Sequence, residues 1–174
     1  MPENQPAVRI ERDGSIAVLT LNRPEAHNAI NSEMTDALRS ALAEVEADQT
    51  VRVIILTGAG NSFCAGMDLG AFLDGQGNDI LFGENRFAGF VDAPRSKPVI
   101  AAIEGAALAG GCEIALACDL IVASETAVFG LPEVGVGIIP VAGGAFRLAR
   151  KIPPAKALEL VLTADRMSAF DADT

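Results

Sequence analysis

The stretch that decides the fold is PVIAAIEGAALAGGCEIALACDLIVAS, from Pro98 to Ser124. Its apolar ends, Pro98–Ile103 and Leu120–Ala123, are short runs of the kind that form buried strands. Between them, Gly110-Gly111 precedes Glu113–Ala117, which we predict to be helical. A strand, a helix and another strand in succession predict an α/β domain.

The segments before this stretch predict the same kind of architecture. Val8–Glu11 and Ser15–Leu21 flank Asp13-Gly14, a residue pair that favours a tight turn, so they predict a β-hairpin. Val51–Thr57 is a short β-branched run and predicts a buried strand. A helix is expected between the hairpin and this strand, beginning after an N-cap at Asn31 or Ser32 and continuing through about residue 48. Its apolar residues recur at steps of three and four: Met34, Leu38, Leu42 and Val45.

The remaining segments comprise one irregular stretch and further predicted strands and helices. Gly70–Arg95 is expected to be a mobile loop with a helix around Asn85–Val91. Ala127–Phe129 predicts a strand, and Gly143–Lys151 and Ala155–Thr163 predict helices. No internal repeat or linker divides the sequence, so we expect one domain over residues 1–174.

Composition and charge exclude several classes of partner. The formal net charge of −10 repels phosphate backbones and anionic membrane surfaces, so neither nucleic acid nor membrane is expected as a partner. A small anionic ligand remains possible, because unpaired backbone N–H groups can hold one locally. The apolar residues from 99 to 123 are not expected to span a membrane, since they include Glu104, Glu113 and Asp119.

The cysteines and the N-terminal residues predict a cytoplasmic protein. Cys64, Cys112 and Cys118 cannot all pair within one chain, and their spacing matches no zinc site, so we expect reduced thiols and no metal. Residues 1–14 lack the basic start and apolar core of a signal peptide. His27 is the only histidine, and nothing near it in the sequence supports a histidine-dependent triad.

Glu113 is the first candidate for chemistry. It follows Gly110-Gly111 at the predicted start of a helix, where unpaired N–H groups can hold an oxyanion. Its ordinary role would be to favour the helix N-terminus. Its neighbours are small or apolar, however, so we predict a partly buried carboxylate with a raised pKa, suited to proton transfer near neutral pH.

Two further stretches have ordinary interpretations when taken alone. FCAGMDL, from Phe63 to Leu69, reads as a turn between a strand and a helix, with Gly66 allowing close packing. FGLPEVGVGIIP, from Phe129 to Pro140, reads as a glycine-rich turn with an exposed Glu133. Neither this turn nor Gly58-Ala59-Gly60 fits a dinucleotide-binding fingerprint, because the third glycine is missing.

Taken together, these segments resemble the crotonase superfamily, also called the enoyl-CoA hydratase/isomerase family. The resemblance is carried in order by Leu19–Asn22, NRPEAHNAI, SFCAGMDL, the Pro98–Ser124 stretch, FGLPEVGVGIIP and GGAFRLAR. It covers essentially the whole chain. It implies a spiral of ββα turns and acyl-CoA thioester substrates, with no cofactor besides the coenzyme A of the substrate.

The resemblance also assigns roles to residues. It implies an oxyanion hole made by the backbone N–H groups of Met67 and Gly110, and a catalytic pair of glutamates, Glu113 and Glu133. For a hydratase we expect Glu113 to deprotonate the attacking water and Glu133 to protonate C2. Residues implied to contact substrate or CoA are Ala65, Gly66, Asp68, Leu69 and Val141.

The sequence departs from the family pattern at several positions. Val141 stands where many family hydratases have glycine, Gly70 where a basic residue often contacts CoA, and Ala109 where a further glycine occurs. The sequence also stops at Thr174, where the family continues with further helices. The leading expectation is an enoyl-CoA hydratase. The alternatives are a Δ3–Δ2 enoyl-CoA isomerase, which needs one proton-shuttling carboxylate, and a non-catalytic acyl-CoA-binding protein.

An oligomer is expected as well. Pro132–Ile139 and Ala155–Leu162 offer more apolar surface than one small layer covers, and such surface marks interaction sites. Crotonase-like proteins form trimers, often paired into hexamers. We therefore expect a homotrimer or hexamer.

Overall fold

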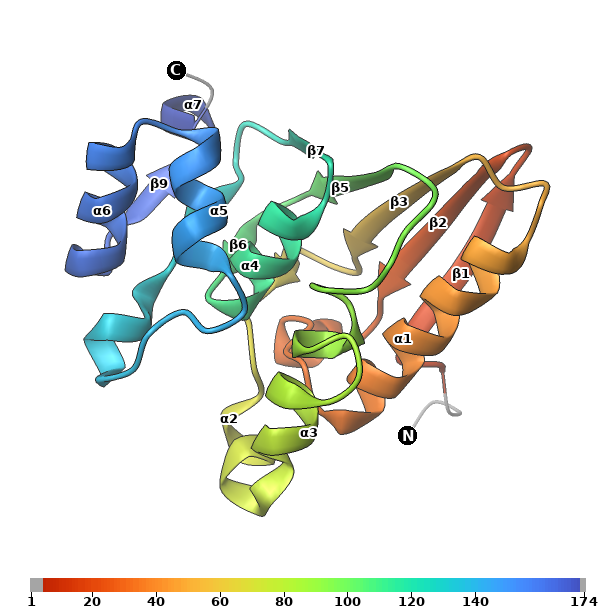
Figure 1. Ribbon diagram of the computed structural model, residues 1–174, viewed down its shortest axis with the longest axis horizontal. Helices are drawn as coiled ribbons and strands as arrows, with labels where there is room; N and C mark the ends of the chain where they lie inside the picture. Colours follow the sequence, from red (N-terminus) through yellow and green to blue (C-terminus); the bar gives the residue numbers. More distant parts are fainter. Residues whose placement is uncertain (1–4, 173–174) are drawn as a thin grey trace.

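The computed structural model describes residues 5–172, which form two β-sheets with helices packed around them (Figure 1). One sheet has five strands in the order β1-β2-β3-β5-β7: β1 (Val8–Asp13), β2 (Ile16–Leu21), β3 (Val53–Gly58), β5 (Val99–Ile103) and β7 (Leu120–Ala123). The other has four strands in the order β4-β6-β8-β9: β4 (Ser62–Cys64), β6 (Ala106–Leu108), β8 (Val128–Gly130) and β9 (Arg166–Ser168).

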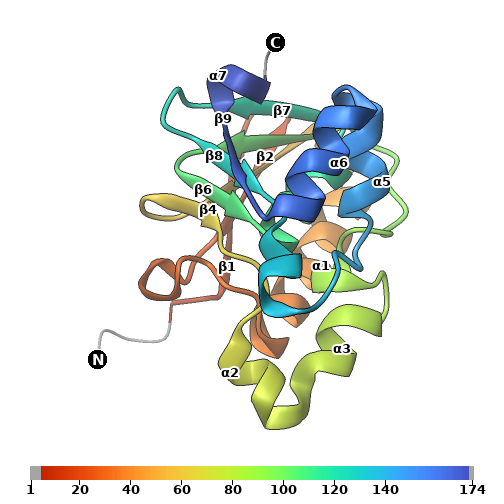
Figure 2. The same cartoon turned by 90° about the vertical axis from the view of Figure 1, so that its left-hand side faces the viewer.

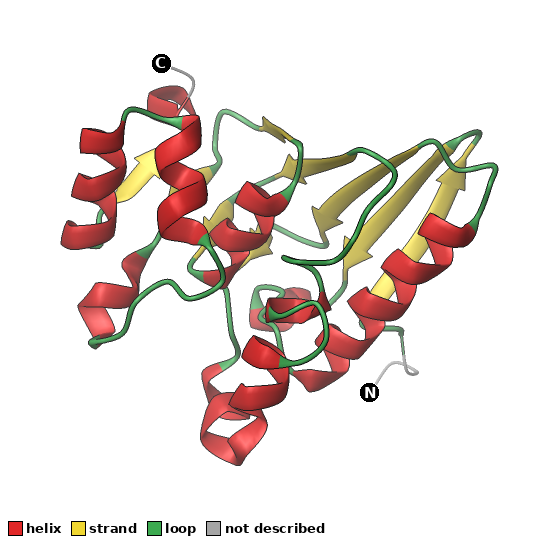
Figure 3. Cartoon of the chain, viewed as in Figure 1, coloured by secondary structure: helices red, strands yellow, loops and turns green. Residues whose placement is uncertain are grey.

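The helices follow the strands along the chain (Figure 3). They are α1 (Ser32–Ala47), α2 (Leu69–Ala71), α3 (Gly77–Phe82), α4 (Gly110–Ala117), α5 (Gly144–Lys151), α6 (Pro154–Thr163) and α7 (Ala169–Ala172). A π-helical segment, Phe72–Gln76, joins α2 to α3, and short 3-10 turns occupy Pro24–Ala26, Phe87–Gly89 and Pro132–Val136. α5 and α6 pack side by side at the end of the molecule remote from α1 (Figure 1).

The chain alternates between the two sheets as it advances. β3 leads into β4, β5 into β6 and β7 into β8, and a helical segment follows each pair. Neighbouring strands from β2 to β7, and from β4 to β8, run parallel, while β1 and β9 pair antiparallel at the edges. Figure 2 shows β4, β6 and β8 side by side. Each passage is one turn of a ββα spiral, which confirms the predicted α/β class.

The N-terminal predictions are confirmed in detail. β1 and β2 form the expected hairpin, and Gly14 takes a left-handed φ of 55° in its turn. The side chain of Asn31 caps α1 by accepting a hydrogen bond of 2.9 Å from the backbone N–H of Met34. The apolar face predicted for this helix is buried: Met34, Leu38, Leu42 and Val45.

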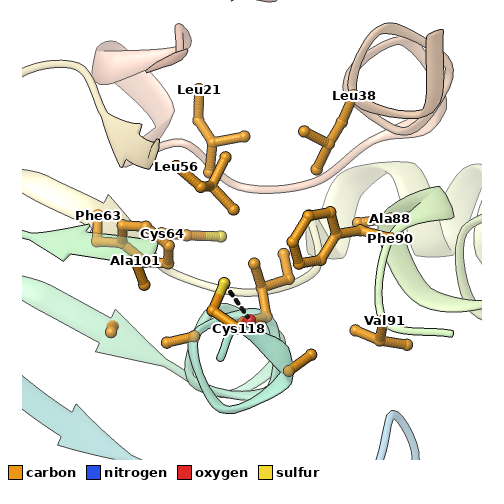
Figure 4. Close-up of a cluster of buried hydrophobic side chains, with 14 of the residues drawn as sticks. Leu21, Leu38, Leu56, Phe63, Cys64, Ala88, Phe90, Val91, Ala101 and Cys118 are labelled. Atoms are coloured by element: carbon orange, nitrogen blue, oxygen red, sulfur yellow. Dashed lines mark hydrogen bonds between the residues drawn. The ribbon is translucent and has the colours of Figure 1, made fainter. Parts of the chain in front are cut away.

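The core lies between α1, the five-stranded sheet and α4. Figure 4 shows Leu38 of α1 facing Leu21 and Leu56 of the sheet, with Phe90 and Cys118 on the other side of the cluster. All eight residues of α4 are buried, so this helix runs through the interior rather than over the surface. Among residues 5–172, no helix is both long and apolar enough to cross a membrane.

The prediction for residues 70–95 needs correction. The helix there is α3, at Gly77–Phe82, while the expected helix around Asn85–Val91 is reduced to one 3-10 turn. Asn85, Arg86 and Ala88 all have φ near +60°, which an α-helix does not permit. This backbone turns Phe87 inward, where its ring lies against Gly110. Tertiary packing thus overrides the local pattern.

Candidate active site

Glu113 lies in the first turn of α4, and its side chain is buried in the protein with 3% of its surface exposed. Its Oε1 accepts two backbone hydrogen bonds, from the N–H of Ala142 at 2.8 Å and from the N–H of Gly144 at 2.7 Å. Ala142 lies in the loop before α5 and Gly144 is the first residue of that helix, and Gly143 between them takes a left-handed φ of 96°. These two N–H groups therefore hold one oxygen of the carboxylate in a fixed place, and the other carries none of the described hydrogen bonds.

The environment of Glu113 prepares it to exchange a proton near neutral pH. Burial raises the pKa of Glu113 to about 7, because the charged form loses its hydration. The N–H of Gly144 opposes this effect, and the negative charge of Glu133 adds to it. The sequence prediction of a buried Glu113 with a raised pKa is confirmed.

Glu133 lies in the 3-10 turn Pro132–Val136 and is also buried, with 6% of its surface exposed. Its Oε2 is buried without a hydrogen-bond partner among residues 5–172, and burial raises its pKa. An orphaned buried carboxylate oxygen is rare in proteins and calls for a partner from outside the chain, such as water or a ligand. The interpretation of Glu133 as an exposed turn residue, drawn from the residues alone, is wrong.

The two N–H groups named for an oxyanion hole are both unpaired. Met67 sits between Gly66, whose C=O accepts from Ile30, and Asp68, whose N–H donates to the C=O of Ile30. The N–H of Met67 itself takes no part in this pairing. Gly110 is the first residue of α4, so its N–H has no acceptor within the helix. Within the described chain, neither N–H donates a hydrogen bond.

The segments that carry these two groups are in direct contact. Gly66 has a φ of 99°, and a Cβ at its position would lie 3.1 Å from the nitrogen of Gly110 and 2.9 Å from the Cβ of Ala109. A side chain at Gly66 would therefore push the two loops apart. The glycine allows the close packing that the sequence predicted for this turn.

The glycine pair before Glu113 is fixed by packing. A Cβ at Gly110 would stand 2.3 Å from the ring of Phe87, and one at Gly111 would stand 2.1 Å from the carbonyl oxygen of Cys64. Ala109, in contrast, carries a side chain at φ 49° and ψ −127°, a region that favours glycine. Ala109 is one of the positions at which the sequence departs from the family pattern.

The other residues assigned to substrate contact differ in whether their polar groups already have partners within the protein. The carboxylate of Asp68 is held within the protein by Arg23 and by the N–H groups of Gly70 and Ala71. The N–H of Ala65 donates to the C=O of His27. Leu69 and Val141 are 69% and 39% exposed, so both side chains are available to a ligand.

His27 and the cysteines have structural places. His27 takes a left-handed φ of 50° after the Pro24–Ala26 turn, and its Nδ1 lies 3.3 Å from the Oγ of Ser62. Cys64, Cys112 and Cys118 are free and buried, and burial raises the pKa of each thiol to about 12. The thiols therefore stay protonated and are poor nucleophiles.

An open cavity of about 940 Å³ lies between α4, α5, β7 and β9. Cys112 and Leu116 line it from α4, Leu148 and Ile152 from the α5 region, and Met167 from β9. Neither Glu113 nor Glu133 lines it, so it is a separate feature from the carboxylate pair.

A known protein family matches most of the length of this chain. The family model for enoyl-CoA hydratase/isomerase matches residues 11–174. The chain belongs to the enoyl-CoA hydratase/isomerase family. A protein of Rhizobium meliloti named "Probable enoyl-CoA hydratase" is 43% identical over 169 residues, which are 94% of this chain and 64% of that protein.

Solved structures of family members superimpose closely. A crystal structure of an enoyl-CoA hydratase from Mycobacterium marinum is 49% identical with a TM-score of 0.92, over 97% of this chain and 66% of that one. A carnitinyl-CoA dehydratase from Mycobacterium avium is 45% identical with a TM-score of 0.90, over the same shares. These likenesses confirm the crotonase-like fold. The chain spans 64–66% of the length of these three relatives.

Proposed function

We propose that this protein is an enoyl-CoA hydratase, which adds water across the C2=C3 bond of a 2-enoyl-CoA thioester. The observation that carries the proposal is the pair of buried carboxylates, Glu113 and Glu133, whose pKa values are both raised. One is fixed by two backbone N–H groups and the other has an oxygen without a partner. The relatives are named as a hydratase and a dehydratase of CoA thioesters, which supports the same reaction type.

The oxyanion hole accounts for activation of the substrate. When water attacks C3, negative charge develops on the thioester oxygen as an enolate. The unpaired N–H groups of Met67 and Gly110 are the donors that would stabilise this charge. Removing one such donor from an oxyanion hole costs about 3–4 kcal/mol of transition-state stabilisation. No metal is needed for this step.

The carboxylates divide the proton transfers. Glu113, with a pKa of about 7, is partly ionised at neutral pH and takes a proton from water as the oxygen bonds to C3. Glu133, whose protonated form is favoured because burial raises its pKa, gives a proton to C2. The C=C π bond is consumed, one C–O and one C–H bond form, and a proton passes from Glu113 back to Glu133 through solvent. Because the two groups interact, their titrations belong to the pair.

The proposal also covers substrate binding, oligomeric state, cellular compartment and pathway. Ala65, Gly66, Leu69 and Val141 lie near the proposed oxyanion donors or the Glu113 loop, and we assign them to acyl-CoA contact together with the backbone of Asp68. We further propose a cytoplasmic homotrimer or hexamer acting in fatty acid β-oxidation. Exposed apolar side chains on the single chain support the oligomer: Val136, Ile139, Leu158 and Leu162.

The test is the loss of enoyl-thioester absorbance when the protein is mixed with crotonyl-CoA. We expect steady loss, and the same loss in Glu159→Gln, an exposed carboxylate on α6 that pairs with Lys156. No loss with crotonyl-CoA, but a gain of that absorbance with a 3-enoyl-CoA, would mean a Δ3–Δ2 isomerase. Tight acyl-CoA binding with neither change would mean a non-catalytic binding protein.

A further inference from the structure

Arg23 connects two loops that the proposed active site needs. It follows β2, and its side chain is about four-fifths buried. Nη1 donates to the C=O of Ala29 at 2.7 Å, and both Nη1 and Nη2 donate to Oδ2 of Asp68, at 3.2 and 3.1 Å. Asp68 directly follows Met67, the proposed oxyanion donor. One side chain thus contacts both the 27–30 loop and the 65–68 loop.

The backbone pairing between these loops sets where the Met67 N–H points. Ile30 donates to the C=O of Gly66 at 2.8 Å and accepts from the N–H of Asp68 at 2.9 Å. The pairing is that of a parallel bridge, in which the residue between the two contacts directs its own N–H away from the partner. These two bonds hold Met67 beside Ile30. A contact that fixes the two loops relative to each other therefore helps to fix the direction of the Met67 N–H.

Asp68 extends the clamp to the next helix. While Oδ2 faces Arg23, Oδ1 caps α2 by accepting from the N–H groups of Gly70 at 3.0 Å and Ala71 at 3.2 Å. The N–H of Ala71, followed by Arg23, lowers the pKa of Asp68, so the carboxylate stays charged. Met67 is therefore held on both sides, by Ile30 and by a carboxylate with fixed partners.

The backbone of Arg23 is also fixed. Its N–H donates to Oδ1 of Asn28 at 2.9 Å, and its C=O accepts from the N–H of Asn28 at 2.8 Å. Asn28 is fully buried, and its Nδ2 donates to the carbonyl oxygens of Ala59 and Ser62 at 2.9 and 2.7 Å. The guanidinium is thus anchored to the connection between β3 and β4, and it can transmit that rigidity to the 65–68 loop.

We propose that Arg23 is a positioning residue for the oxyanion hole, which acts through Asp68 and Ala29 to hold the N–H of Met67 toward the thioester oxygen. This inference rests on the proposed function. A planar fork is required, because the carbonyl of Ala29 and the carboxylate of Asp68 are bound at once. A lysine has a single nitrogen and can satisfy only one of them well. A misplacement of catalytic groups by about 1 Å can cost 10²-fold in rate.

The test combines kinetics with infrared spectroscopy of a bound, unreactive thioester. The probe is butanoyl-CoA labelled with ¹³C at the carbonyl, whose stretching band shifts to lower frequency when N–H groups donate to its oxygen. We compare wild type with Arg23→Gln, Arg23→Lys and Asp68→Asn, which keeps an acceptor for the α2 N–H groups. The control is Arg12→Gln, which removes an exposed ion pair of Arg12 with Glu44 at 2.7 Å.

We expect Arg23→Gln to lower kcat for crotonyl-CoA by about 10-fold or more with a smaller change in KM, and to move the band toward that of the free thioester. Arg23→Lys and Asp68→Asn should fall between it and wild type, and Arg12→Gln should match wild type. An unshifted band and unchanged kcat in Arg23→Gln, with an active wild type, would overturn the inference. A wild type that neither hydrates crotonyl-CoA nor shifts the band would instead overturn the proposed function. If Arg23→Gln does not fold, the two conservative variants decide between these outcomes.

Discussion

Gly144 donates its backbone N–H to Oε1 of Glu113 over 2.7 Å while leaving no space for a side chain of its own. A Cβ there would stand 2.8 Å from Cγ of Glu113 and 2.9 Å from Cδ2 of Leu131. The contact that orients the carboxylate therefore depends on glycine at this position. It ties the start of α5 to the first turn of α4, 31 residues earlier in the chain.

Gly144→Ala tests this relationship. We expect the variant to lose about 1–3 kcal/mol of stability through overpacking, and to lower kcat about 10-fold or more because Glu113 shifts. Urea unfolding and crotonyl-CoA hydration measure the two effects. Gly135→Ala is the matched control, since a Cβ there meets only the Cβ of Ala164 at 3.5 Å, an ordinary contact. A Gly144→Ala variant with wild-type kcat would show that the Gly144 contact does not orient Glu113.

The pH dependence of hydration should report Glu113. Its pKa is raised to about 7 by burial, and the proposed base works only when ionised. We therefore expect kcat/KM for crotonyl-CoA to rise as the pH approaches about 7 and Glu113 ionises, and to fall at higher pH once the proposed acid, Glu133, has lost its proton. Glu113→Gln should remove this acidic limb from whatever rate remains, whereas Glu133→Gln should retain it. A limb that persists in Glu113→Gln would assign the base to another group.

The same group should make stability depend on pH. In the unfolded chain the carboxyl titrates near its ordinary value of 4.5, and in the folded chain near 7, so the folded state binds more protons between these values. Its contribution is therefore full below about pH 4.5 and is lost as pH rises toward 7. Glu113→Gln should lack this loss and gain about 1–3 kcal/mol relative to wild type from the lower to the higher pH. Urea unfolding at several pH values measures it, and parallel curves for the two proteins would contradict the burial argument.

Ala109 carries backbone strain that glycine would relieve. At φ 49° and ψ −127° a Cβ is unfavourable, and strain of this kind costs of order 1–3 kcal/mol. We expect Ala109→Gly to raise the free energy of unfolding by about 1 kcal/mol, after the entropic cost of glycine in the unfolded chain. Ala155→Gly in α6 is the control and should destabilise by about 1 kcal/mol. A loss in both variants would mean that the surroundings require the Ala109 side chain.

Sequence patterns predicted the elements that depend on local signals. The cap at Asn31 and the helical spacing from Met34 to Val45 gave α1, and Asp13-Gly14 gave the hairpin. β4, β6 and β9 have three residues each, too few for a period to be visible, and β-pairing alone defines them. The segment from Asn85 to Val91 was misjudged because its conformation serves the burial of Phe87 against Gly110.

The candidate site likewise contains residues that the sequence indicates and residues that it does not. Glu113 was evident from the residues, since a carboxylate in an apolar helix is conspicuous. Glu133 was not, because its burial depends on how α6 and the Pro132–Val136 turn pack together, and only the family resemblance assigned it a role. In the sequence, Arg23 appears only as one letter of the NRPEAHNAI segment. Its partner Asp68 lies 45 residues away, a separation that leaves no local signal.

The most direct test of the central claim is the hydration rate of crotonyl-CoA by Glu113→Gln and Glu133→Gln, compared with wild type and with the exposed-site variant Glu159→Gln. Glutamine keeps the size of each side chain and its acceptor oxygen but cannot exchange the proton. We predict that each active-site variant lowers kcat by about 10²-fold or more, the scale of a positioned acid or base, with little change in butanoyl-CoA binding. Near-wild-type hydration by either variant would remove that carboxylate from the reaction and contradict the two-glutamate account.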